Sequence, residues 1–73
     1  MNKNKFKGML ANRGENQKTL AEAMGMSRVT LSRKINESHN ASFKLPEIEV
    51  IKARYRLTST EVNDNFLLTE YLH

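Results

Sequence analysis

The fold of this chain is decided by residues 16–36, which read NQKTLAEAMGMSRVTLSRKIN. Two short helical patterns flank a glycine in this stretch. Ala21 is small at the point where the second helix must cross close to the first, and a larger side chain would push the helices apart. Gly25 adopts a positive φ without a Cβ penalty, so it can end the first helix and turn the chain sharply. With Leu31 facing inward, the stretch predicts two packed helices joined by a tight turn.

The outward face of the second helix carries side chains that can reach a partner. Four residues share the face opposite Leu31: Arg28, Val29, Ser32 and Arg33. The N-terminal turns of a helix fit the major groove of DNA, where arginine donates two hydrogen bonds to guanine and an aliphatic group packs on a thymine methyl. A serine can donate or accept, so its target base stays open. We therefore predict that these four side chains contact DNA bases; a solvated helix face is the alternative.

Three further motifs follow this helix pair: SRKIN at 32–36, FKLPEI at 43–48 and LTSTEVNDNF at 57–66. Over about residues 4 to 67, the chain resembles the Cro/cI-type phage repressors and most closely the small phage-associated helix-turn-helix proteins. The resemblance implies an all-α, compact five-helix lambda-repressor-like DNA-binding domain, with its second and third helices forming the helix-turn-helix. It also implies that the outward face of the third helix makes the base contacts.

Phosphate contacts are expected around the same face. Gln17 stands at the start of the first helix of the pair, where free N–H groups and the helix dipole favour an anion, and the resemblance implies that a glutamine there binds a backbone phosphate. The weaker candidates for phosphate contact, each of which could equally be a solvated side chain, are Lys18, Ser27, Lys34, Asn36, Ser38, His39, Asn40 and Lys44. Lys34 departs from the commoner family pattern, which has an apolar residue there. His39 and His73 have no partners spaced as metal ligands, so we expect no metal site.

Capping residues predict where the first three helices begin and end. A first helix is expected at about Asn4–Asn12, before Gly14. Asn16 and Ser27 are expected N-caps of the central pair, because their side chains can accept the free N–H groups of a first turn. Asn36 is expected to end the pair in the left-handed region, which asparagine tolerates.

Two more helices are expected after a polar loop at residues 37–44. Pro46 suits the first turn of a fourth helix, in which Tyr55 continues the apolar spacing, and Thr58 with Glu61 forms a capping box that begins a fifth. The apolar residues expected in the resulting thin core are Phe6, Leu10, Leu20, Ala21, Met24, Met26, Leu31, Ile35, Phe43, Leu45, Ile48, Ile51, Leu57, Val62 and Phe66.

Length and composition limit the class of protein. With 73 residues, the chain predicts a single domain over residues 1–73. It has no cysteine and no apolar run long enough for a membrane span or a signal peptide, so we expect a cytoplasmic protein. The resemblance to phage repressors implies that this is the cytoplasm of a bacterial host, with the protein associated with the nucleoid. The net charge is +4, with nine Lys/Arg against three Asp/Glu in residues 1–44 and three against five in residues 45–73. The basic half holds the central helix pair, which favours a polyanionic partner on that side.

The C-terminal tail is more apolar than a free terminus needs. Part of it is expected to pack on its own domain and the remainder on a second copy, since repressors of this type bind paired half-sites through two-fold symmetry. The residues expected at a homodimer interface are Phe66, Leu67, Leu68, Tyr71 and Leu72. A tail folded entirely on its own core is the alternative.

The sequence favours a sequence-specific transcriptional regulator that binds double-stranded DNA at a two-fold symmetric operator, as a phage or prophage repressor or Cro-like protein does. No Ser/His/Asp or Cys/His set and no phosphate-binding glycine loop is evident, so we expect no catalysis and no cofactor. Neither a membrane nor a small-molecule effector is an expected partner, and RNA is disfavoured because the A-form major groove excludes a helix. The alternative is a protein-interaction module, such as an antirepressor that binds another regulator.

Overall fold

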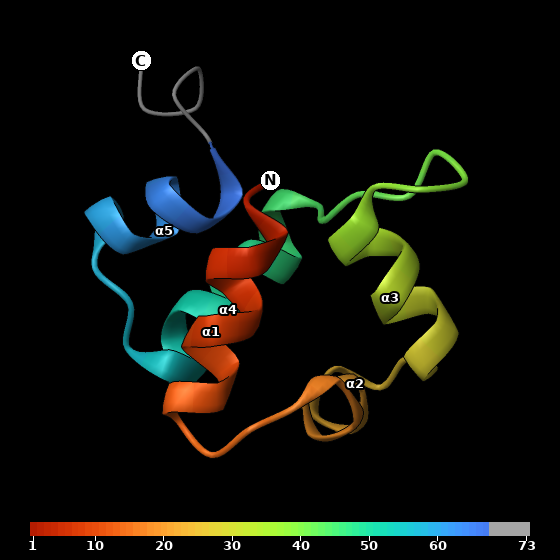
Figure 1. The fold of residues 1–73 in the computed structure, drawn as a ribbon, viewed down its shortest axis with the longest axis horizontal. Helices are drawn as coiled ribbons and strands as arrows, with labels where there is room; N and C mark the ends of the chain where they lie inside the picture. The colour runs from red at the N-terminus through yellow and green to blue at the C-terminus, as the bar shows by residue number, and fades with distance from the viewer. Residues whose placement is uncertain (68–73) are drawn as a thin grey trace.

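Five helices make up the part of the chain that the computed structural model describes, residues 1–67. In chain order they are α1 (Lys3–Asn12), α2 (Gln17–Met24), α3 (Arg28–Asn36), α4 (Leu45–Tyr55) and α5 (Ser59–Phe66), with no strand among these residues. Figure 1 shows α1 at the centre with α4 behind it, α5 on one side and α3 on the other. α1 packs on α5, and α2 packs on α3. The expectation of a compact, all-helical, five-helix fold is confirmed.

The helices begin where polar side chains accept backbone N–H groups. Asn16 Oδ1 accepts the N–H of Thr19 at 2.9 Å, and Thr19 Oγ1 accepts the N–H of Asn16 at 3.0 Å. Ser27 Oγ accepts a first-turn N–H of α3 at 3.1 Å. At α5, Thr58 Oγ1 accepts the N–H of Glu61 at 3.1 Å, and the Glu61 carboxylate accepts the N–H of Thr58 at 3.0 Å. Because these bonds satisfy donors that a first turn leaves free, the predicted caps are confirmed.

Left-handed residues close α2 and α3. Gly25 follows α2 with φ 68°, as expected. α3 continues through Asn36, and the left-handed residue is Glu37, with φ 54°. The prediction for Asn36 is therefore wrong by one residue. Its side-chain amide donates to Ser32 Oγ at 3.3 Å, one turn back along α3, and this contact suits a residue that is still helical.

The core lies between the helices and includes a cluster of three aromatic rings. The ring centroid of Phe6 lies 5.8 Å from that of Phe43 and 5.5 Å from that of Phe66. Phe43 and Phe66 meet edge to face, with their centroids 5.5 Å apart. These tilted contacts tie α1, the loop before α4 and the end of α5 together. The side chains with almost no exposed surface are Phe6, Leu10, Leu20, Leu31, Ile35 and Ile51.

The composition of the core differs from the prediction in part: Tyr55 is also buried, and Met24, Met26 and Phe43 are only partly buried against the core. Leu45 was predicted to be buried, but it is 49% exposed. It shares a helical face with Ile48, yet it is the first residue of α4, where the neighbouring helices leave half of its surface in solvent. Met9 and Asn65 are buried and were not predicted. The Asn65 amide donates to the carbonyl of Glu61 at 2.8 Å, which compensates for part of the cost of burying it.

The residues predicted to form a dimer contact lie in three different places. Phe66 is 6% exposed and belongs to the aromatic cluster of its own domain, so it is not on a surface that could meet a second copy. This corrects its predicted role. Leu67 follows α5 and is 59% exposed. The other three, Leu68, Tyr71 and Leu72, lie outside the described residues.

Candidate nucleic-acid interface

The short connection between α2 and α3 determines which face of α3 reaches solvent. The Met26 N–H donates to the carbonyl of Ala21 at 3.0 Å, which closes α2 and turns the chain just after Gly25. Ala21 is 1% exposed and Leu31 has no exposed surface, so the two helices meet on this side. The opposite face of α3 is therefore left to solvent.

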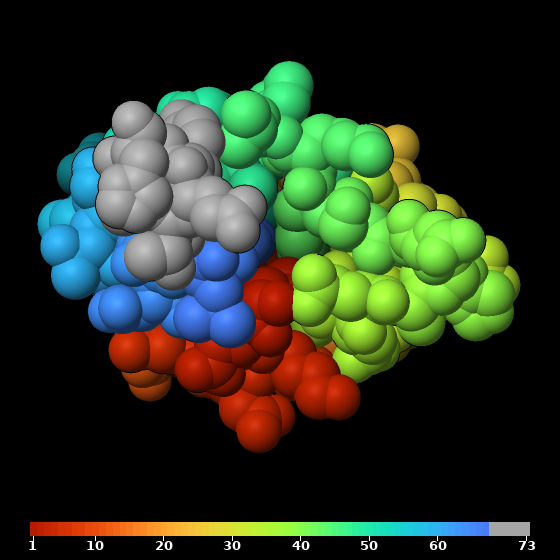
Figure 2. Space-filling view, turned by 90° about the horizontal axis from the view of Figure 1, so that it is seen from above, coloured from red at the N-terminus to blue at the C-terminus, as the bar shows by residue number. Residues whose placement is uncertain are grey.

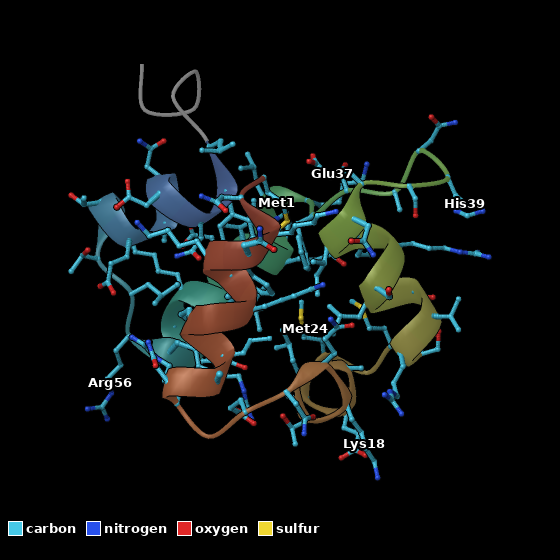
Figure 3. The ribbon with its side chains drawn as sticks, in the orientation of Figure 1. Met1, Lys18, Met24, Glu37, His39 and Arg56 are labelled. Atoms are coloured by element: carbon cyan, nitrogen blue, oxygen red, sulfur yellow. The ribbon has the colours of Figure 1, made fainter. Side chains whose placement is uncertain are left out.

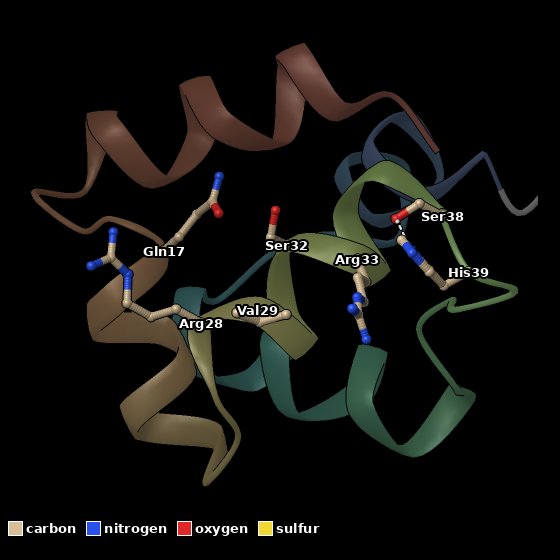
Figure 4. Close-up of a pocket in the computed structure, with 7 residues that line it drawn as sticks. All are labelled: Gln17, Arg28, Val29, Ser32, Arg33, Ser38 and His39. Carbon is tan, nitrogen blue, oxygen red and sulfur yellow. Dashed lines mark hydrogen bonds between the residues drawn. The ribbon is translucent and has the colours of Figure 1, made fainter.

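An open hollow of about 680 Å³ runs along this outer face of α3. Figure 4 shows the seven side chains that line it: Gln17, Arg28, Val29, Ser32, Arg33, Ser38 and His39. Each of them was predicted from the sequence to contact DNA. They come from the start of α2, from α3 and from the loop after α3, so the fold gathers three separate segments on one surface.

The middle of the hollow combines unpaired cations with an exposed aliphatic group. Arg28 and Arg33 are exposed and form no ion pair within residues 1–67, so their guanidinium donors are available. Val29 is 59% exposed, so its methyl groups can contact a partner. Ser32 is partly buried, and its Oγ accepts the hydrogen bond from Asn36. This row can donate hydrogen bonds and can also make an apolar contact.

The two ends of the hollow carry groups suited to an anion. Gln17 is the first residue of α2, so the free N–H groups of that turn and the positive end of the helix dipole lie beside it. At the other end, Ser38 Oγ and His39 Nδ1 are 3.3 Å apart. Figure 4 shows the α3 row lying between Gln17 and the Ser38–His39 pair. His39 and Asn40 both have left-handed φ values, 54° and 58°, which carry the loop past the end of α3.

Other predicted phosphate contacts lie on the surface but do not line the hollow. The Ser27 hydroxyl is the N-cap of α3, and its Oγ also donates to the Thr30 hydroxyl at 2.9 Å, so both of its hydrogen-bonding functions are in use. The others in this group are exposed side chains: Lys18, Asn36, Asn40 and Lys44.

Lys34 is not brought to this surface, which corrects its predicted phosphate contact. Its ammonium donates to Glu47 Oε1 at 3.0 Å and to the carbonyl of Ser42 at 3.3 Å, and its side chain is only 15% exposed. Burial alone would raise the pKa of Glu47, but the N–H of Lys44 and the Lys34 ammonium outweigh burial and hold that pKa below its ordinary value of 4.5. Lys34 therefore ties α3 to the first turn of α4.

The lysines of α1 were not among the predicted DNA contacts, and all three are exposed. Lys3 and Lys7 are spaced i, i+4, and this spacing places both on one side of the helix. This i, i+4 spacing of two lysines was the feature of the sequence that could have indicated a basic side of α1.

Comparisons of this chain with protein-family models, curated proteins and solved structures found no match. No helix among the described residues has the length and apolar character that crossing a membrane requires. Residues 1–67 also contain no group of histidine, cysteine or acidic residues arranged to hold a metal ion. The function is therefore inferred from the geometry and chemistry of the hollow along α3.

Proposed function

We propose that this protein is a sequence-specific transcriptional regulator that binds double-stranded DNA. In this proposal α2 and α3 act as the helix-turn-helix of a lambda-repressor-like domain, and α3 lies in the major groove. One observation carries the proposal: side chains from three segments converge on a single open hollow along the outer face of α3. The basic charge of residues 1–44 supports a polyanionic partner on the same side.

The chemistry of the hollow suits the groups that the major groove presents. The groove is about 12 Å wide and admits one helix. Arg28 and Arg33 can each donate two hydrogen bonds to guanine O6 and N7, and Val29 can pack on a thymine methyl. Gln17 and His39, at the two ends of the hollow, are placed to bind the phosphates that flank those bases.

The proposal includes a homodimer on a two-fold symmetric operator, acting as a phage or prophage repressor that covers a promoter. A single helix reads only a few base pairs, and helix-turn-helix dimers read two half-sites about 34 Å apart. The exposed Leu67 provides an apolar group directly after α5 that a second copy can cover. Tail residues beyond it complete the contact in this proposal.

Catalysis is not part of the proposed function. The N–H and hydroxyl of Thr58 lower the pKa of Glu61, and the pKa of Glu47 is also lowered. Both carboxylates are therefore ionised near neutral pH and bound to capping groups. Neither is suited to donate a proton as a general acid.

The decisive experiment is selection of binding sites from a random duplex DNA library with purified protein, followed by affinity measurements across a salt series. A two-fold symmetric site whose affinity falls steeply as salt rises is the expected result. Weak binding without sequence preference would refute a sequence-specific regulator.

Arg28→Ala then tests the placement of α3 on the selected site. Loss of a bidentate contact to guanine should cost about 1–3 kcal/mol and relax the preference at one base pair. Arg56→Ala is the matched control, because it removes the same charge on the opposite side of the molecule from His39 (Figure 3). An equal loss for Arg28→Ala on selected and random DNA would identify a phosphate contact instead.

A second candidate function is a protein-interaction module, such as an antirepressor. It is favoured by an apolar hollow of about 270 Å³ between the end of α2 and the start of α4, which is lined in part by Met24, Met26 and Val50. Val50 is 51% exposed there. If the DNA selection yields no preferred site, the purified protein is used to capture partners from a host lysate. A captured regulator that Val50→Glu no longer binds would support this function.

A further inference from the structure

Three lysines in the first half of α1 are exposed, but they differ in their partners. Lys5 Nζ lies 3.5 Å from Asp64 Oδ2 of α5. Lys3 and Lys7 form no ion pair within residues 1–67. Two of the three ammonium groups are therefore unneutralised by the domain itself.

The helical spacing places the unpaired lysines on the side of α1 away from α5. Successive residues of an α-helix are rotated by about 100°, so Lys3 and Lys7 each lie about 160° around the axis from Lys5. The contact with Asp64 shows that Lys5 faces α5. Figure 1 shows α3 on the opposite side of α1 from α5. Lys3 and Lys7 therefore belong to the side of α1 that is turned toward α3.

The start of α1 also lies next to the end of α3. The amino group of Met1 contacts the carboxylate of Glu37, the residue that follows α3. Figure 3 labels both residues at this junction, and in Figure 2 the red N-terminal residues adjoin the yellow-green residues at the end of α3. In Figure 4 the side chains of Gln17 and Ser32 point toward α1. No residue of α1 lines the hollow, but the start of α1, which carries Lys3 and Lys7, lies beside the end of α3, on the side toward which Gln17 and Ser32 point.

We infer that Lys3 and Lys7 form a further binding site for the phosphodiester backbone, beside the DNA that α3 contacts. This inference rests on the proposed function and extends its interface to a helix outside the α2–α3 pair. Lysine binds phosphate as a mobile point charge, so these contacts add affinity without sequence preference. Lys5 does not take part, because it faces α5 and is paired with Asp64.

The test compares the double variant Lys3→Gln/Lys7→Gln with the control Lys5→Gln. The slope of log affinity against log salt concentration is measured for each on the selected DNA site. Each lost phosphate contact reduces the slope by about 0.9, so the double variant should lose about 1.8. Between about 50 mM and about 200 mM salt, its affinity should then fall about 12-fold less than that of the parent protein. Lys5→Gln removes a charge from the same helix and should leave the slope near the parent value.

Two results would overturn the inference while leaving the proposed function intact. One is a parent-like slope for the double variant, and the other is an equal reduction for Lys5→Gln, which would reflect net charge alone. Circular dichroism melting of all three proteins excludes unfolding as the cause. If the parent protein itself selects no DNA site, the proposed function has failed first, and that failure is visible before either variant is tested.

The double variant should also lose affinity by the same factor on selected and random duplexes, because phosphates are common to both.

Discussion

Leu31→Ala tests whether the inner face of α3 is what holds that helix on the domain. Leu31 has no exposed surface. Removing about three buried carbons at about 0.8 kcal/mol each gives a transfer cost of about 2.4 kcal/mol. A residual cavity adds to this, and measured losses for such substitutions span about 2–5 kcal/mol. Met24 and Met26 pack against the core and are flexible enough to fill part of the space, so we expect a loss of about 3 kcal/mol in the free energy of unfolding.

The assay is thermal and urea unfolding followed by circular dichroism. For a domain of this size, about 3 kcal/mol corresponds to a decrease in Tm of about 12–24 °C. The urea midpoint should fall while the slope of the transition stays constant, because the surface exposed on unfolding is nearly unchanged.

Val29→Ala is the matched control, two residues away on the same helix. Val29 is 59% exposed, so its truncation should change stability by no more than about 0.5 kcal/mol. It should instead weaken the preference for a thymine in the DNA site. A Leu31→Ala protein that melts within about 3 °C of the parent, or a Val29→Ala protein that is destabilised as strongly, would refute the assignment of inner and outer faces.

Three further predictions address the turn, the acid limb of stability and the tail. Gly25→Ala should destabilise the fold by about 1–2 kcal/mol, because φ is 68° at this residue, even though the added Cβ would meet no atom within 4 Å. Gly8→Ala lies in equally open space inside α1 and should stabilise the fold by about 0.5–1 kcal/mol. Equal urea midpoints for the two would contradict this. The pKa of Glu47 is lowered in the fold, so its contribution to the free energy of unfolding is present above about pH 4.5 and is lost as the pH falls through the lower, folded-state pKa. In Glu47→Gln, the free energy of unfolding should therefore fall less steeply below that pH. If it falls as steeply as in the parent protein, the ion pair of Glu47 is not a cause of the loss of stability in acid. Leu68→Glu with Leu72→Glu should weaken cooperative DNA binding without changing the melting temperature, and unchanged sedimentation and binding curves would show that the tail is not the interface.

The helix boundaries were predictable because capping chemistry is local. Asn16 and Ser27 accept N–H groups only three residues further along the chain, so their neighbours in the sequence suffice to identify them. Gly25 turns the chain through its own backbone preference. The position of Asn36 was missed by one residue, which is the usual size of error at the end of a helix.

The outer row of α3 was predictable for a similar reason. Helical periodicity placed Arg28, Val29, Ser32 and Arg33 opposite Leu31, and all four line the hollow. Their convergence with Gln17 needed the packing of α2 on α3 and could not be read from spacing alone. The role of the row in binding DNA stays a prediction.

Spacing along the chain was therefore enough to identify the five helices, the N-caps of α2, α3 and α5 and the polar face of α3, because each depends on residues within one or two turns. Which side chains are covered, and which cations are neutralised, depends on segments far away in the chain. Phe66 is buried by Phe6, and Lys34 is neutralised by Glu47. Leu45 has the spacing of a buried residue but remains half exposed. Burial and ion pairing are properties of the assembled surface, so only the packing of distant segments determines them.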